Sequence, residues 1–375
     1  MMPELSDMYS SPGLLAVPKI FFPGHVYQGP RALRFLRELK GEILFVVSRG
    51  AWERHEPALA GNLASPARDI FWADPEPTEK TFRDFAERLA HKNYQYVIGF
   101  GGGSAMDVAK TARIRPTGID ARGVKVILIP TTAGSGSEVS RYALFINEAG
   151  EKEPMVSADL LPDTVLYDPS FLLSLPPDIT AYTTADAYAH ALEGLTSRLA
   201  NPLSDVFARE AARLILAHAL SAYREPDNLE ARSRLQIAGF FGGLAQNSAS
   251  VGLAHGLADF FGPRWGMAHG LAVALFLPPV IAQNLKKNPA YYEKLGPGLA
   301  DSVYEETRRL FGAMGLEGIA EKFLADAGAP SGAPAPLGAL VGFLKKDPAA
   351  KTHPFMPNED ELKEILDAAH IAHEP

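Results

Sequence analysis

The sequence predicts a parallel α/β domain in residues 1–175 and an all-helical domain in residues 176–375. Three observations predict this division. Short apolar runs alternate with helical segments in the first half, as in parallel sheets that are covered on both faces. From Asp178 onward strand-like runs vanish, and helical periodicity with alanine-rich faces takes over. Between the two patterns, the stretch LYDPSFLLSLPPD supplies turn prolines, which put the boundary near residues 168–177.

Length and composition narrow the classes of function. The chain has 375 residues, of which 21% are charged and 47% hydrophobic, an ordinary globular composition. Its net charge of -8 argues against nucleic acid or an anionic membrane as partner, because both require a basic surface. Cysteine is absent, so a transition-metal site must be built from His, Asp and Glu. We expect a small-molecule substrate and a cytoplasmic location, since neither a signal peptide nor a membrane span is recognisable.

The elements of the first half follow from runs of apolar residues and from helical spacing. The expected strands are 19–22, 43–47 (ILFVV), 69–73, 96–100 and 124–129 (VKVILI). The expected helices are 31–40, 52–62, 78–92 and 104–115. In such sheets, ligands bind at the carboxyl ends of the strands.

Two glycine-rich loops fall at such strand ends. In residues 101–104 we expect Ser104 to be the N-cap of the next helix, with Asp107 completing a capping-box-like start. The free N–H groups of that first turn predict an anion site. The second loop, residues 130–138, follows VKVILI and combines hydroxyls with glycines that can bond phosphate and ribose. Either loop alone is compatible with a plain turn, but the two together favour a dinucleotide.

Arg49 follows the strand ILFVV and Ser48. In dinucleotide-binding folds an acidic residue at this strand end bonds the ribose 2′-hydroxyl, whereas a basic one accommodates a 2′-phosphate. Arg49 therefore favours NADP over NAD, although an arginine here is also typical of a solvated surface.

The helical half contains candidate metal ligands. Asp186 and His190 are four residues apart and share one face of an expected helix over 178–199, with Glu193 on the same side. We expect Asn201-Pro202 to start the next helix. Alanines surround them, and unpaired ionisable groups buried among alanines cost free energy, which favours a metal. His255 and His269 each precede a glycine in VGLAHGLADFFGPRWGMAHG. One carboxylate and three imidazoles suit Fe(II) or Zn(II). The alternative is a set of hydrogen-bonded core histidines.

The remaining histidines have no comparable partners in the sequence, and we interpret them as surface or loop residues. They are His25, His55, His91, His218, His353, His370 and His373.

The motifs GGGSAMDVAK, PTTAGSGSEVS, DAYAHALEG and the His255/His269 pair, in this order, resemble the iron-dependent (group III) alcohol dehydrogenase family. The resemblance covers nearly the whole chain, and PNEDELKEILDAA looks like the family's final helix. It implies a Rossmann-like N-terminal domain and an all-α C-terminal domain, the dehydroquinate synthase-like fold, with the active site between them. It also implies Fe(II) or sometimes Zn(II), NADP or NAD, and a homodimer or larger homo-oligomer.

The resemblance assigns residues to the metal and to the cofactor. The implied metal ligands are Asp186, His190, His255 and His269. The implied cofactor contacts are Gly102, Gly103, Ser104, Asp107, Thr131, Thr132, Ser135 and Lys152, together with Arg49, where the family often has Asp. The implied reaction is hydride transfer between an alcohol and an aldehyde or ketone, with the substrate oxygen bound to the metal.

Asp259 departs from the family, which usually has a second histidine at this position. We hypothesise that Asp259 faces the substrate and bonds hydroxyl or cationic groups; a helix-surface carboxylate is the alternative. Other readings stay open: a hydroxy-acid or sugar-derivative dehydrogenase, a dehydroquinate-synthase-like lyase, or a catalytically silent cofactor-binding protein. The lyase is disfavoured because the sites of such lyases are rich in Lys and Arg, whereas in this sequence only Arg264 is basic near the candidate ligands.

Overall fold

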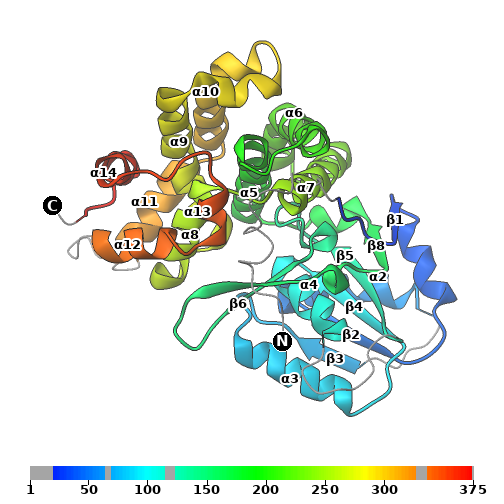
Figure 1. Ribbon diagram of the computed structural model, residues 1–375. Helices are drawn as coiled ribbons and strands as arrows, with labels where there is room; N and C mark the ends of the chain where they lie inside the picture. Colours follow the sequence, from blue (N-terminus) through cyan, green and yellow to red (C-terminus); the bar gives the residue numbers. More distant parts are fainter. Residues whose placement is uncertain (1–19, 64–68, 115–122, 327–335, 374–375) are drawn as a thin grey trace.

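The computed structural model describes residues 20–63, 69–114, 123–326 and 336–373 (Figure 1). Its first half is an α/β domain built on a six-stranded sheet in the order β1-β8-β5-β4-β2-β3, in which all neighbouring strands are parallel. The strands are β1 His25–Gln28, β2 Ile43–Val47, β3 Asp69–Trp72, β4 Tyr96–Gly101, β5 Lys125–Pro130 and β8 Thr164–Tyr167. The predicted parallel sheet is therefore confirmed.

Helices cover both faces of this sheet, because alternate side chains of its strands are buried on opposite sides. Leu44 and Val46 of β2 pack toward α3 and α4, while Phe45 and Val47 pack toward α2 and the first 3₁₀ helix. The elements are the 3₁₀ helix Ala32–Glu38, α2 Arg49–Ala60, α3 Glu79–Ala90 and α4 Gly103–Lys110, which continues as a 3₁₀ turn over Thr111–Arg113.

The expected strand 19–22 is wrong where it can be compared. Residues 20–22 form no strand, Lys19 lies outside the described residues, and β1 begins only at His25. This strand is exposed throughout, and among the described strands it pairs with β8 alone, so it lacks the apolar run that marks a buried strand. Strand β8 and the antiparallel hairpin β6 Tyr142–Ile146 and β7 Lys152–Val156 were not predicted.

The second half is helical, and its α-helices pack around one large core (Figure 1). They are α5 Pro177–Thr196, α6 Pro202–Arg224, α7 Leu229–Ala249, α8 Leu253–Trp265, α9 His269–Lys287, α10 Leu299–Ala313, α11 Leu316–Asp326, α12 Leu337–Leu344, α13 Pro348–Thr352 and α14 Glu359–Ala368. The start predicted at Asn201-Pro202 is confirmed: Asn201 caps α6, and Pro202 is its first residue.

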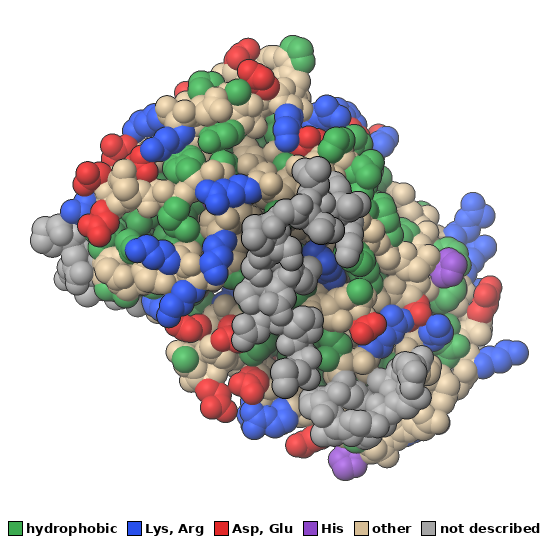
Figure 2. Space-filling model, in the orientation of Figure 1, with side chains coloured by type: hydrophobic (Ala, Val, Ile, Leu, Met, Phe, Trp, Pro, Cys, Tyr) green, Lys and Arg blue, Asp and Glu red, His purple; other side chains and the backbone are tan. Residues whose placement is uncertain are grey.

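The surface is mixed in charge. Lys/Arg and Asp/Glu side chains are intermingled over the face seen in Figure 2. Within the described part of the chain, none of the helices combines the length and the apolar character that crossing a membrane requires.

Candidate metal centre

Three neighbouring helices bring the predicted ligands together. Asp186 and His190 lie one turn apart on α5, His255 lies in the first turn of α8, and His269 is the first residue of α9. Small residues allow this close approach: a Cβ on Gly242 of α7 would lie 3.0 Å from the Ala187 carbonyl oxygen of α5. The alanine-rich face that suggested a packed helix is therefore the face that holds the site.

The three imidazoles converge on one carboxylate oxygen. Asp186 Oδ1 lies 3.4 Å from His190 Nε2, 3.4 Å from His255 Nε2 and 3.6 Å from His269 Nε2. Ligand atoms bound tetrahedrally to one ion at about 2.0–2.1 Å stand about 3.3–3.4 Å apart, so these spacings fit a shared ion. The donor atoms of Asp186, His255 and His269 all lie within 4.8 Å of one another, whereas His190, although 3.4 Å from Asp186 Oδ1, does not belong to this tight group.

The site is buried and its polar atoms are unsatisfied. Asp186 Oδ1 and His255 Nε2 have no hydrogen-bond partner among the described residues. Such orphaned atoms are rare in protein interiors. A cation between them would satisfy both, so the donor set fits a divalent metal.

The electrostatics of the site favour a bound cation. Burial acts to raise the pKa of Asp186, but the facing imidazoles outweigh it and hold this pKa well below its usual range. Burial lowers the pKa of His190 to about 4, and it lowers the pKa of His269 well below its usual value, which keeps both rings in the neutral, ligating form. His255 differs: burial would lower its pKa, but Asp186 and Glu193 raise it to about 10. These carboxylates thus attract positive charge to the centre.

Glu193 orients one of the ligands. Its Oε2 lies 2.5 Å from His255 Nδ1, and its Oε1 accepts a hydrogen bond from the Ala254 N–H at 2.7 Å. A proton held on Nδ1 leaves Nε2 free to face Asp186, as carboxylates behind metal-binding histidines do. From the sequence, Glu193 is expected either to support a candidate ligand histidine or to join a buried pair on its helix face; its contact with His255 is the first of these.

His353 lies in a loop, as one of the two predicted possibilities, but it is not at the surface: it is 1% exposed and has a partner. It follows α13, which packs on α8, and its Nδ1 accepts a hydrogen bond from the Leu253 N–H at 3.3 Å. The side-chain hydroxyl of Thr352 ties the same turn to the Val251 carbonyl at 2.6 Å. The burial comes from a packing contact between residues about a hundred positions apart, which sequence spacing does not reveal.

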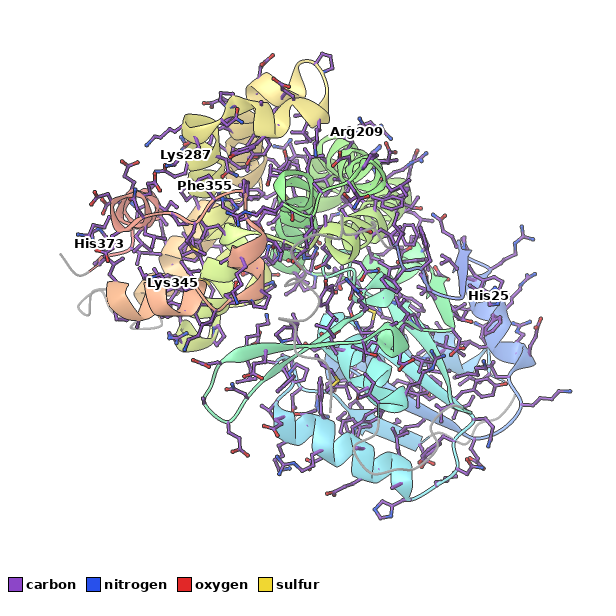
Figure 3. All side chains as sticks on the ribbon, viewed as in Figure 1. His25, Arg209, Lys287, Lys345, Phe355 and His373 are labelled. Atoms are coloured by element: carbon purple, nitrogen blue, oxygen red, sulfur yellow. The ribbon has the colours of Figure 1, made fainter. Side chains whose placement is uncertain are left out.

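The other six histidines behave differently. His25, His91 and His370 are exposed, whereas His55, His218 and His373 are half-buried. Figure 3 shows the labelled His25 and His373 at the periphery of the molecule.

The glycine after each ligand histidine has a structural explanation. A Cβ on Gly256 would lie 2.9 Å from Asp347 Oδ1, and a Cβ on Gly270 would lie 2.8 Å from the Tyr182 carbonyl carbon. Protein groups, rather than a ligand, therefore approach these two glycines.

The two glycine-rich loops lie side by side at the carboxyl ends of β4 and β5, as predicted from the sheet. The Thr131 N–H donates to the Gly101 carbonyl at 2.9 Å, and a Cβ on Gly103 would lie 2.9 Å from Ser135 Oγ. Gly101 has φ +155°, a conformation that favours glycine. A second face of the later loop meets α5, the helix of the candidate ligands Asp186 and His190, because a Cβ on Gly134 would lie 2.7 Å from Thr183 Cβ.

The predicted capping box at Ser104 is wrong. Gly102 is the N-cap of α4 and makes no side-chain capping bond, while Ser104 is inside the helix and its Oγ donates to the Pro75 carbonyl. The glycines let the helix start earlier than a serine cap would. The backbone N–H groups of this first turn still point out of the helix N-terminus, where anions are stabilised.

Asp107 is buried and its oxygens are occupied within the protein. Oδ1 accepts from Ser137 Oγ at 2.5 Å and lies 3.0 Å from Lys110 Nζ, while Oδ2 accepts from the Leu144 N–H at 3.0 Å. Asp107 therefore anchors the second loop to α4. Its contact with a cofactor stays a prediction, as do those of Gly102, Gly103, Ser104, Thr131, Thr132 and Ser135.

Lys110, which the sequence reasoning did not single out, completes this anchor. Its side chain is fully buried, and its ammonium donates to the Ser137 carbonyl at 2.9 Å and to the Tyr142 carbonyl at the start of β6. The signal was a lysine three residues after Asp107, in a helix whose neighbouring residues Met106, Val108 and Ala109 are apolar.

We expect Lys110→Met to destabilise the protein by about 3–5 kcal/mol, because it leaves the Asp107 carboxylate buried without its cation. The free energy of unfolding in urea measures this loss. Lys80→Met, at an exposed i,i+4 pair with Asp84, is the control and should change stability by less than about 1 kcal/mol. Equal stability of the two variants would contradict the anchoring role.

The remaining predicted residues lie at the edges of the site. Lys152 is in β7, and its Nζ lies 3.5 Å from Asp259 Oδ1 of α8. Asp259 Oδ1 also lies 3.7 Å from His269 Nδ1. Asp259 is thus not a free surface carboxylate but already faces a cation. Arg49 is exposed at the start of α2, with its guanidinium 4.7 Å from the ring centroid of Trp72.

Comparisons with known proteins agree with this arrangement. The family model described as iron-containing alcohol dehydrogenase matches residues 23–169, and the model for the C-terminal part of the Fe-containing alcohol dehydrogenase family matches residues 180–370. The 1-propanol dehydrogenase of Salmonella typhimurium is 33% identical over 69% of this chain and 71% of its own length. The 1,3-propanediol dehydrogenase of Citrobacter freundii is 30% identical over 78% of this chain and 80% of its own length.

Solved structures show the same fold. An alcohol dehydrogenase from Oenococcus oeni superposes with a TM-score of 0.79 at 25% identity, covering 94% of this chain and all of its own. The two family models together span both the parallel sheet and the helices that hold Asp186, His190, His255 and His269. The chain belongs to the iron-containing alcohol dehydrogenase family.

Proposed function

We propose that this chain interconverts a short-chain alcohol and its aldehyde at a divalent metal held by Asp186, His190, His255 and His269, with NADP as the preferred cofactor. Alcohol–aldehyde oxidoreduction is the activity of its family. The observation that carries the metal assignment is the convergence of three imidazole Nε2 atoms on the buried Asp186 Oδ1. The assignment of the site residues to roles is our proposal.

The protein's own groups prepare this site for hydride transfer. When bound, an iron or zinc ion supplies Lewis acidity toward the substrate oxygen, and the nicotinamide supplies the hydride carrier. Glu193 holds the His255 ring so that Nε2 faces inward. The loop after β5 reaches α5 at Thr183, one turn before Asp186, so a dinucleotide lying on both loops would end near the metal ligands.

The substrate class follows from the relatives and from Asp259. The relatives named above act on 1-propanol and 1,3-propanediol. The second candidate is a hydroxy-acid or sugar-derived substrate, because Asp259 stands where the family usually has a histidine. Initial rates with propanal, a hydroxylated short-chain aldehyde, a semialdehyde of a carboxylic acid and a sugar aldehyde test the choice, using Fe(II)- and Zn(II)-loaded protein. No oxidation of NADPH or NADH with any of the four would refute the proposed function.

The preference for NADP rests on Arg49. Its guanidinium is exposed at the carboxyl end of β2, beside Trp72 at the end of β3. A hydrogen bond between charged groups, such as arginine and a 2′-phosphate, contributes about 1.5–3 kcal/mol. Arg49→Asp should therefore lower the ratio of kcat/KM for NADPH to kcat/KM for NADH by about 10- to 100-fold. Arg54→Asp, exposed on the same helix, is the matched control. Equal kcat/KM for the two cofactors in the parent protein would contradict the assignment.

We also propose a homodimer or larger homo-oligomer, as the family resemblance implies. The exposed edge strand β1, which carries the exposed side chains of Val26 and Tyr27, supports it. Unpaired strand edges with apolar side chains are surfaces that proteins commonly cover.

A further inference from the structure

Asp259 presents a buried oxygen between two donors from separate parts of the chain. Asp259 Oδ1 lies 3.5 Å from Lys152 Nζ in the α/β domain and 3.7 Å from His269 Nδ1 at the start of α9. The same oxygen has no hydrogen-bond partner among the described residues. Charge-assisted hydrogen bonds are about 2.7–2.9 Å long, so both donors are close to Asp259 Oδ1 but slightly too far to bond it. A buried, unsatisfied acceptor is costly, and here two donors stand ready to satisfy it.

The arrangement repeats, more loosely, what Glu193 does for His255. In both cases the ring nitrogen that points away from Asp186 faces a carboxylate oxygen, at 2.5 Å for His255 and at 3.7 Å for His269. A histidine that ligates through Nε2 carries its proton on Nδ1, and that N–H requires an acceptor. The Asp259 carboxylate faces the His269 ring in the position to accept it.

We propose that Asp259 is a positioning residue: it holds His269 through Nδ1–H as Glu193 holds His255, and Lys152 balances its charge from the α/β domain. The inference rests on the proposed function, because it takes the Asp186 centre to bind a metal. It also replaces the hypothesis that Asp259 recruits a cationic substrate. Lys152 and Asp259 are 10% and 18% exposed at their side chains, so the charge of Asp259 is already compensated inside the protein.

A histidine at this position, as the family usually has, would not perform the same task. A neutral imidazole has no charge with which to compensate Lys152, whereas a carboxylate does. The aspartate therefore ties the hairpin strand β7 and the ligand His269 to one residue of α8.

Metal affinity tests this role directly, apart from turnover. Wild type, Asp259→Asn, Glu193→Gln and Lys152→Met are loaded with Co(II), and affinity is measured by competition with a chelator of known strength. Visible absorption per bound cobalt reports the orientation of the ligands. Asp259→Asn and Glu193→Gln should each weaken Co(II) binding by about 10- to 100-fold and shift the cobalt spectrum. Asp84→Asn, an exposed carboxylate paired with Lys80, should leave both unchanged.

Lys152→Met separates positioning from a merely structural ion pair. If Asp259 acts on His269, loss of the ammonium leaves that contact in place, and Co(II) affinity stays within about threefold of wild type, well inside the loss expected for a missing orienting partner. Equal losses of Co(II) affinity in Lys152→Met and Asp259→Asn would overturn the inference, since they would mean that the ion pair itself matters. Wild-type affinity and spectrum in Asp259→Asn, with losses in Glu193→Gln, would overturn it while leaving the proposed metal centre intact. Wild-type protein that binds no cobalt would overturn both.

Discussion

His269→Ala is expected to lose its metal and to lower turnover at least about a hundredfold. Lewis-acid stabilisation of a developing negative charge contributes several kcal/mol, and each 1.36 kcal/mol is a factor of ten in rate. His269 is the ligand best suited to this test, because its side chain is 23% exposed and it begins α9, whereas His190 and His255 lie deep in the helical core. The folded structure should therefore survive the substitution.

The measurement pairs metal content of the purified variant with turnover of NADPH and aldehyde. His218→Ala is the matched control, since His218 is half-buried on α6 and does not belong to the centre. Circular dichroism and the thermal midpoint show whether the fold is intact. Stoichiometric metal and wild-type turnover in His269→Ala would refute the assignment of this ligand. Loss of turnover in the His218 variant as well would point to a general defect instead.

The elements that the sequence predicted are those whose signal is local. Continuous apolar runs identified β2, β4 and β5, and the Asn-Pro start identified α6, because burial on both faces and helix capping leave marks within a few residues. Strand β1 escaped because its residues are exposed at the sheet edge. The hairpin β6–β7 was not predicted because it forms a separate two-stranded sheet outside the alternating pattern of strands and helices. Its contact with α8 through Lys152 joins residues that are distant in sequence.

The same distinction runs through the site. The i,i+4 pair Asp186/His190 is visible in the sequence, since one helix turn sets its geometry. Contacts between residues distant in sequence are harder to predict. Glu193 could be expected to support a candidate ligand histidine, but not which one, because it bonds His255 across 62 positions. The contact of His353 with Leu253, across 100 positions, left no sign in the sequence. At Ser104 a local signal gave a wrong prediction. Serine is a common N-cap, but the preceding glycines allow the helix to begin earlier, with Gly102 as its N-cap.

Gly136→Ala, at a close contact between glycines of the two halves of the molecule, is expected to lower the free energy of unfolding substantially. Gly136 has φ +58° and lies in the loop of candidate cofactor residues. A Cβ there would meet Gly243 Cα of α7 and lie 2.9 Å from its backbone nitrogen. Backbone meets backbone at this contact, so no side chain can rotate to make room. We expect Gly136→Ala to cost about 1–2 kcal/mol for the left-handed conformation and about 1–3 kcal/mol for the overlap.

Two further alanine variants separate these costs. Gly243→Ala meets the same contact from the other side, with its Cβ 2.7 Å from Gly136 Cα, but Gly243 is not among the positive-φ glycines, so it should lose the overlap energy alone. Gly318→Ala, in the exposed first turn of α11 with nothing within 4 Å of the added Cβ, should be neutral or slightly stabilising. Unfolding in urea ranks the three. A smaller loss for Gly136→Ala than for Gly243→Ala would contradict a backbone cost at position 136.

Gly136→Ala should also raise the KM for NADPH, because the loop between β5 and Gly136 carries Thr131, Thr132 and Ser135. Its metal content should be unchanged, since the substitution does not displace α5, α8 or α9, the helices of the candidate ligands.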